Sequence, residues 1–81
     1  MFAKSAQKEL NKIPKAFGNR ILAKIETLTE QPRQHGSIKL EGSDNTYRIR
    51  IGDYRVIYSI YDKALVVDVI KIDHRKQVSW R

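Results

Sequence analysis

Four arginines stand among apolar and β-branched residues in the second half of this 81-residue chain. Residues 46–75 read TYRIRIGDYRVIYSIYDKALVVDVIKIDHR, and the four are Arg48, Arg50, Arg55 and Arg75. A guanidinium is always charged and costly to bury, so strands that carry four of them are expected to present them to an anion. A planar guanidinium binds phosphate oxygens in pairs, and donors held in place in this way stabilise the charge that develops in phosphodiester chemistry.

The charge of the whole chain also favours an anionic partner. Sixteen lysines and arginines against nine aspartates and glutamates give a formal charge of +7. A charge of this size on so short a chain favours nucleic acid, the ribosome or an acidic protein as partner, although it also serves solubility alone. The basic residues are spread along the chain, so a folded surface is expected to carry the charge.

The composition argues against several classes of site. The chain has no cysteine, which excludes a disulfide framework and a thiolate metal site and fits a reducing cytoplasm. No uncharged run is long enough to span a bilayer and no signal peptide is recognised, so no membrane partner is expected. The spacing of His, Asp and Glu predicts no metal site, and no cofactor is expected.

The first 30 residues are expected to form two helices. A helix over residues 4–13 should end there because Pro14 disfavours helical geometry at the residue before it, and Ser5 is a candidate cap. A second helix is expected over residues 15–30, with Pro32 beyond its end. The apolar stripe expected on this second helix comprises Phe17, Ile21, Leu22, Ile25 and Leu28.

Strands are expected to follow, at residues 37–40, 47–51, 54–61 and 65–72. The pair Gly52-Asp53 is typical of a two-residue hairpin turn. The last of these strands is nearly all apolar and is expected to be central in the sheet. Two helices followed by a meander predict a single domain over residues 1–81, an α+β fold in which an N-terminal α-hairpin packs on one face of an antiparallel sheet of about four strands.

The alternation along the strands predicts which side chains face the helices. Tyr47, Ile49 and Ile51 should be covered, which leaves the intervening arginines, Arg48 and Arg50, on the open face. Arg55 in the next strand should join them, together with Tyr61. Like charges that face one another across strands are unfavourable, so such a cluster indicates a functional demand.

Three segments of the chain together resemble a known family. They are KSAQKELNKIPKAFGNRILAKIETL, YRIRIGDYRVIYSIYD and VVDVIKIDHR, and the most specific part is YRIRIGDYRVIY followed by an apolar strand ending in HR. This pattern resembles the RelE/ParE superfamily of type II toxin–antitoxin systems over residues 3–78, and is closer to the RelE branch, which cleaves messenger RNA on the ribosome. The resemblance implies a metal-independent endoribonuclease in which the ribose 2′-OH attacks the adjacent phosphate and gives a 2′,3′-cyclic phosphate.

The resemblance also implies roles for individual residues. Arg48 and Arg50 match the family's basic pair, Arg55 matches its strand arginine, and Arg75 matches the arginine after the last strand. The closing tyrosine of some members falls at Ser79, which puts the acid/base group in question. His74 is expected beside the arginines and could stand in for that tyrosine, because histidine suits proton transfer near neutral pH. The alternative is an exposed loop residue.

A second departure from the family lies at the N-terminus. Relatives begin with a β-strand before the first helix, whereas only Met1–Ala3 precede Lys4 here. The first family strand is therefore expected to be missing or vestigial. A sheet without it would expose an edge that invites pairing with another chain.

Further basic and aromatic residues are candidates for binding messenger RNA and ribosomal RNA. A stripe of lysines three or four residues apart, on or next to the first helix, is a candidate ribosome contact or an ordinary solvated face; it comprises Lys4, Lys8, Lys12 and Lys15. Tyr61 and Trp80 are candidates for stacking on bases, whereas the other tyrosines are expected in the core.

The resemblance implies a cognate antitoxin, a small acidic protein that covers the basic face. Two other functions stay open at this point. One is a ParE-like inhibitor of DNA gyrase, which would bind without catalysis. The other is a degenerate relative that binds its antitoxin and cleaves nothing, which the serine at position 79 and the short N-terminus motivate.

Overall fold

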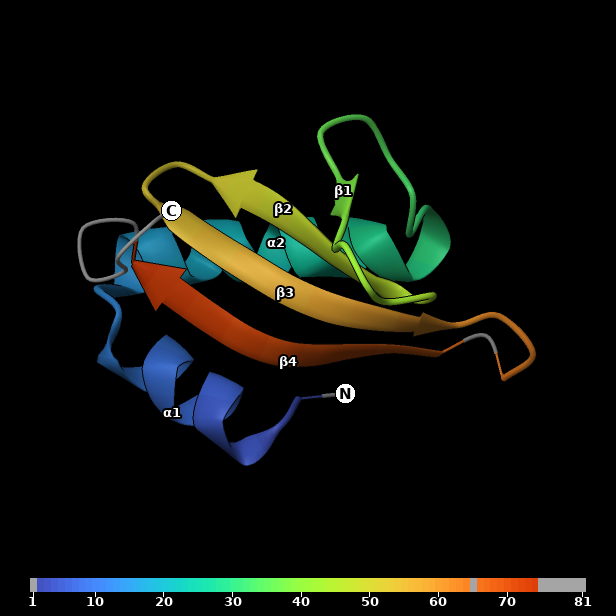
Figure 1. Ribbon diagram of the computed structural model, residues 1–81. Helices are drawn as coiled ribbons and strands as arrows, with labels where there is room; N and C mark the ends of the chain where they lie inside the picture. The colour runs from blue at the N-terminus through green and yellow to red at the C-terminus, as the bar shows by residue number, and fades with distance from the viewer. Residues whose placement is uncertain (1, 65, 75–81) are drawn as a thin grey trace.

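Two helices precede a four-stranded antiparallel sheet in this computed structural model, which describes residues 2–64 and 66–74 (Figure 1). The elements are α1 (Lys4–Lys12), α2 (Lys15–Glu30), β1 (Ile38–Lys39), β2 (Thr46–Ile51), β3 (Tyr54–Tyr61) and β4 (Val66–His74). The strands lie in chain order, and each pairs antiparallel with the next. The predicted α+β architecture is confirmed, and none of the helices in the described part is long and apolar enough to cross a membrane.

The helix boundaries follow the proline signals. Helix α1 ends at Lys12 because Ile13, which precedes Pro14, adopts an extended backbone with φ −79° and ψ 138°. Ser5 does not cap this helix, since the N-cap is Ala3 and no side chain caps it. Instead, the Ser5 hydroxyl donates to the carbonyl of Ile70 in β4 at 3.5 Å, which ties the start of α1 to the sheet.

One hydrophobic core joins both helices to one face of the sheet, called here the covered face. Its buried members are Ala6, Leu10, Ile21, Ile25, Leu28, Ile49, Val56, Tyr58, Ile60, Val67, Val69 and Ile72. The predicted stripe of α2 is wrong at two positions, because Phe17 is 47% exposed and Leu22 is 40% exposed. Gly18 is buried in their place, next to Leu10 of α1.

The strand expected to be central is the last strand of the sheet. Among the described residues, a short piece of the N-terminus lies beyond β4, where Phe2 forms a parallel bridge to Val69 and the amide of Ala3 donates to the Val69 carbonyl at 2.8 Å. This single bridge stands where the resemblance implied a missing or vestigial first strand. Burial of β4 comes from helix α1, which packs against it, and not from a strand on each side.

A β-bulge interrupts the pairing of β3 with β4. Ile57 pairs with Lys71, but the next residue, Tyr58, pairs with Val69, so Ile70 is an extra residue in β4. A bulge shifts the alternation of side chains by one position. Val69 and Ile72 therefore both face the helices, and Lys71 points to the opposite face of the sheet, called here the open face.

Candidate functional site

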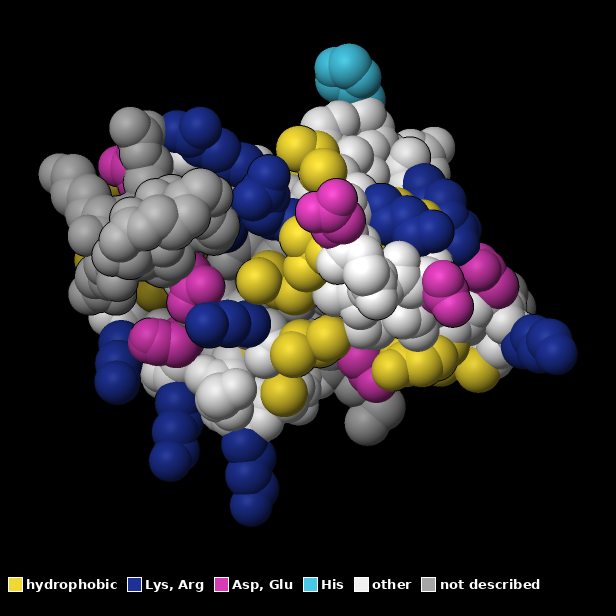
Figure 2. Space-filling view, viewed as in Figure 1, with side chains coloured by type: hydrophobic (Ala, Val, Ile, Leu, Met, Phe, Trp, Pro, Cys, Tyr) yellow, Lys and Arg dark blue, Asp and Glu magenta, His cyan; other side chains and the backbone are white. Residues whose placement is uncertain are grey.

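The hairpin β2–β3 gathers three arginines on the open face. Its turn needs a positive φ at the first central residue, which Gly52 supplies with φ +59°. The resulting register pairs Arg50 with Arg55 and Arg48 with Ile57, so the three arginines occupy two successive rungs of the open face, with the covered pair Ile49–Val56 between them. This is the arrangement that the alternation predicted, and Figure 2 shows dark blue side chains gathered over the end of the sheet where β2 meets β3.

Strand β4 adds two charged residues that sequence reasoning missed. Arg55 pairs with Asp73 and Ile57 pairs with Lys71, so both side chains share the open face with the arginines. The Lys71 ammonium lies 3.6 Å from the Asp73 carboxylate, whose side chain is only 17% exposed. A continuous row of Arg50, Arg55 and Asp73 thus crosses three strands. The signal that could have revealed them is the presence of Lys71 and Asp73 within the apolar segment VIKID. The bulge determines which face of the sheet these two side chains occupy.

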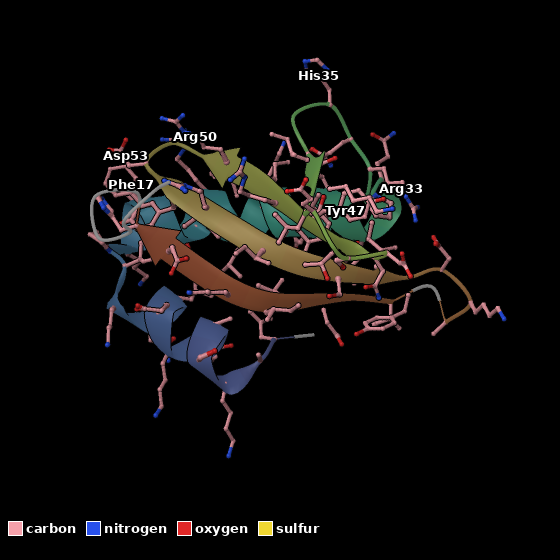
Figure 3. All side chains as sticks on the ribbon, viewed as in Figure 1. Phe17, Arg33, His35, Tyr47, Arg50 and Asp53 are labelled. Atoms are coloured by element: carbon pink, nitrogen blue, oxygen red, sulfur yellow. The ribbon has the colours of Figure 1, made fainter. Side chains whose placement is uncertain are left out.

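Arg50 lies at the margin of this face. Its side chain is exposed, and its Nε–H donates to the carbonyl of Gly52 at 3.3 Å, so the guanidinium is held beside the turn (Figure 3). Arg48 and Arg55 are half-buried. The candidate site therefore combines two half-buried arginines with one at the edge of the sheet, a set suited to holding the oxygens of a phosphodiester.

His74, which was expected beside the arginines, lies on the opposite face of the sheet from Arg48, Arg50 and Arg55. His74 pairs with Tyr54, and the two rings meet edge to face with centroids 4.8 Å apart, on the covered face. A small cavity of about 120 Å³ there is also lined by Glu9, Lys12 and Ile13. Arg55 belongs to the neighbouring rung and points to the opposite face, because side chains alternate along a strand.

The other predicted site residues are spread over the molecule. The lysine stripe is exposed, with Lys4, Lys8 and Lys12 on α1 and Lys15 at the start of α2. Tyr61 is 45% exposed, on the same rung as Val66 at the end of β3 away from the arginines. Arg75, Ser79 and Trp80 lie outside the described residues.

A second polar cluster, which sequence reasoning did not find, lies at the opposite end of the sheet (Figure 3). Arg33 donates two hydrogen bonds to the carboxylate of Asp62, at 3.1 and 2.8 Å, and a third to the Tyr47 hydroxyl at 3.1 Å. These bonds raise the pKa of Arg33, and the guanidinium lowers the pKa of Asp62 below its ordinary value. The Arg33 guanidinium is therefore engaged in internal contacts.

The tyrosines expected in the core include one that is hydrogen-bonded there. Tyr58 is fully buried, its ring stacks on Tyr47 with centroids 6.0 Å apart, and its hydroxyl donates to the Pro32 carbonyl at 2.6 Å. Burial raises the pKa of Tyr58 above its ordinary value. Within residues 2–64 and 66–74, no three His, Asp or Glu side chains are grouped so as to hold a metal ion.

Comparisons with known proteins agree on one family. The model of a family described as the ParE toxin of the type II toxin–antitoxin system parDE matches residues 1–79. A putative toxin RelE1 of Methanocaldococcus jannaschii is 34% identical over 76 residues, which cover 90% of this chain and 84% of that protein. The mRNA interferase toxin RelE of Escherichia coli is 30% identical over 78 residues, which cover 94% of this chain and 81% of that protein.

Solved structures of related toxins share the fold. The archaeal RelE–RelB complex from Pyrococcus horikoshii contains a chain with 36% sequence identity and a TM-score of 0.80, and the match covers 95% of this chain and 93% of that one. The intact RelBE toxin–antitoxin complex of E. coli gives a TM-score of 0.79 at 29% identity, covering 90% of each chain. The family match over nearly the whole sequence and the shared fold together mean that this chain belongs to the RelE/ParE superfamily of type II toxins.

Proposed function

We propose that this protein is the toxin of a type II toxin–antitoxin system and cleaves messenger RNA on the ribosome. The observation that carries the proposal is the presence of Arg48, Arg50 and Arg55 on one face of the sheet, away from the helices. The name of the E. coli relative, mRNA interferase toxin, supports this activity over inhibition of gyrase. The site of action is the cytoplasm, where messenger RNA is translated.

The proposed reaction needs no metal and no cofactor. The ribose 2′ oxygen forms a bond to the adjacent phosphorus, the bond from phosphorus to the 5′ oxygen breaks, and the proton lost from the 2′-OH is balanced by one gained at the leaving 5′ oxygen. Arg55 and Arg75 stabilise the charge on the phosphate, a contribution worth about 3–4 kcal/mol for a well-placed donor. Arg48 and Arg50 hold the RNA backbone, and Lys71 adds a further positive charge to the same face.

The carboxylate of Asp73 supports Arg55 in this scheme. The two residues are directly paired across β3 and β4, and Asp73 is largely covered. A carboxylate beside a guanidinium fixes the orientation of its planar fork, so the donors are set before RNA arrives. His74 is proposed for proton transfer, which requires its imidazole to reach the RNA from the covered face.

Partners follow from the same surface. A cognate antitoxin with an acidic segment complements the formal charge of +7, and related toxins have been solved in complex with RelB antitoxins. The lysine stripe of α1 and Lys15 supply ribosomal RNA contacts away from the proposed cleavage site, and Tyr61 and Trp80 stack on bases. All of these functions are assigned to one domain over residues 1–81.

Induced expression of the protein alone, followed by mapping of messenger RNA ends, tests the proposal. Wild type is expected to stop growth and to leave new ends with a 5′-OH inside codons that are being translated. Arg55→Ala should restore growth, and Arg55→Lys should restore it in part, because lysine keeps the charge but loses the bidentate fork. Lys63→Ala is the matched control, since Lys63 is an exposed cation in the distant β3–β4 turn.

Three results would contradict the proposal. Growth arrest with intact messenger RNA and blocked DNA supercoiling by purified gyrase would establish the ParE-like alternative. A harmless protein that still binds its antitoxin would establish the degenerate alternative. An Arg55→Ala variant that is folded by circular dichroism and remains fully toxic would remove the arginine face from the mechanism.

A further inference from the structure

A second basic surface lies next to the arginine face, on the other side of the edge formed by β2. A groove of about 490 Å³ is lined by Arg20, Lys24 and Thr27 of α2 and by Arg50, Ile51 and Gly52 of the β2–β3 hairpin. We call it the α2–β2 groove. The helix residues are four and three positions apart and therefore share one side of α2. Arg50 faces them from the hairpin, so cations flank the groove on both sides.

Among the described residues, the lining of this groove carries basic side chains and no acidic one. No carboxylate lines the groove, and Arg20, Lys24 and Arg50 form no ion pair with any described residue. Two other cations of the described residues are paired with carboxylates, Arg33 with Asp62 and Lys71 with Asp73. Three cations left together without an acid raise the local potential and favour an anionic occupant.

Among the described residues, no strand pairs with the edge of β2 between this groove and the arginine face. Strand β1 pairs only with Tyr47 and Arg48, so it does not extend alongside the second half of β2. Arg50 lies at this uncovered edge, where its Nε–H is held by the Gly52 carbonyl and its side chain lines the groove. The same residue is directly opposite Arg55 in the register. Arg50 therefore joins the two basic surfaces.

We propose that the α2–β2 groove binds the sugar–phosphate backbone of the RNA on one side of the scissile bond. The strand passes from the arginine face, over Arg50 at the edge of β2, to phosphate contacts with Arg20 and Lys24. This assignment rests on the proposed function and adds two residues that the family resemblance did not supply. It also gives Arg50 a role in guiding the strand into the groove.

The lining favours RNA over an acidic protein segment. A protein segment that docks in a groove anchors apolar side chains in pockets, and here the apolar side chains are limited to Ala23 and Ile51. A phosphate backbone needs only spaced positive charges along an open channel. The Thr27 hydroxyl is occupied, because it donates to the Lys24 carbonyl at 2.6 Å, so the contacts are left to the three cations.

An RNA that cannot be cleaved allows binding to the groove to be measured separately from the cleavage reaction. The probe is a fluorescein-labelled single-stranded RNA with 2′-O-methyl riboses, and its dissociation constant is measured by anisotropy over a series of salt concentrations. Each phosphate contact on a single strand contributes about 0.7 to the slope of log affinity against log salt. The double variant Arg20→Gln/Lys24→Gln should therefore lower the magnitude of this slope by about 1.4.

Matched variants distinguish the effect of a specific binding site from the effect of the total charge of the protein. Lys39→Gln/Lys63→Gln removes two exposed cations outside the groove and should leave more of the slope intact. Arg20→Lys/Lys24→Arg keeps both charges and should keep the wild-type slope, while circular dichroism checks that all variants fold. Equal loss in the groove variant and its control would overturn the proposal, since only total charge would then matter.

Two further outcomes distinguish this inference from the proposed function. If the wild-type protein cleaves messenger RNA and Arg20→Gln/Lys24→Gln keeps the wild-type slope of log affinity against log salt, the groove proposal is wrong and the proposed function stands. A groove-dependent slope in a protein that cleaves nothing would support the groove and overturn the proposed activity.

If the double variant loses affinity for labelled poly-L-glutamate but not for RNA, the groove is a protein-binding surface and the proposal is wrong.

Discussion

Replacing Arg50 by glutamine should stabilise the fold while weakening the activity. Arg50 lies directly opposite Arg55 and also shares the α2–β2 groove with Arg20 and Lys24. The Asn45 carbonyl accepts a hydrogen bond from the amide of Ile60 in β3. The backbone groups of successive residues in a strand point alternately toward one neighbouring strand and toward the other. Arg50 is an odd number of residues from Asn45, so its backbone groups point away from β3. The Arg50–Arg55 pair is then of the non-hydrogen-bonded type, in which side chains approach most closely.

The expected gain in the free energy of unfolding is about 0.5 kcal/mol. Two unit charges about 6 Å apart in water repel by about 0.7 kcal/mol, and like charges opposite one another in a sheet cost about as much. Loss of the exposed hydrogen bond from Arg50 to Gly52, at 3.3 Å, offsets a few tenths of a kcal/mol, since water replaces such a bond readily. Arg55→Gln should gain less, because Asp73 faces Arg55 from β4.

Urea unfolding of wild type, Arg50→Gln and Lys63→Gln at low salt and in 1 M salt measures this effect. The gain should be confined to low salt, because the Debye length shrinks to about 3 Å in 1 M salt. Lys63→Gln removes the same charge from the distant turn and should change stability less. If Arg50→Gln is less stable than wild type, or its gain persists in 1 M salt, the argument from charge repulsion is refuted.

Three further predictions concern residues outside the arginine face. His74→Ala should slow single-turnover cleavage by about 100-fold or more, because the proposed reaction uses its imidazole for proton transfer; a rate close to wild type would show that His74 stays against Tyr54 and transfers no proton. Tyr58→Phe should lower the free energy of unfolding by about 1–2 kcal/mol, because the Pro32 carbonyl loses its partner; an unchanged urea midpoint would contradict this. Asp62→Asn should lower the urea midpoint at neutral pH. Because Arg33 lowers the folded pKa of Asp62, this contribution is present above about pH 4 and is lost as the pH falls through the folded pKa, so the two midpoints should converge in acid; a difference that persists there would contradict the ion-pair argument.

Local patterns were sufficient to predict the elements and the arginine face. The second helix and the strand at Tyr54–Tyr61 have the predicted bounds, because Pro14, Pro32 and Gly52 act on the backbone next to them. Alternation in TYRIRI assigns Arg48 and Arg50 to one face without knowledge of any partner strand. These inferences need only neighbours within a few residues in the sequence.

Features that depend on contacts between residues far apart in the chain could not be predicted from the sequence. The pairing of Arg33 with Asp62 joins positions 29 apart, and no local pattern records it. Burial of Gly18 in place of Phe17 and Leu22 depends on how closely α1 approaches α2, near Leu10. In each case the contact that decides the exposure or pairing of a residue is made by another element of the fold.

The bulge at Ile70 shows how packing of the core determines the composition of the site. In VVDVIKID a strict alternation that buries Val67 and Val69 would also bury Lys71 and Asp73, and two buried charges cost several kcal/mol. One extra residue lets Ile72 enter the core and turns both charges to the open face. The same shift carries His74 to the covered face, next to Tyr54. The demand for an apolar core thus places an acid and a base of β4 beside the arginines and turns the histidine to the other face, so mutations that alter this register should change the open face before they change the fold class.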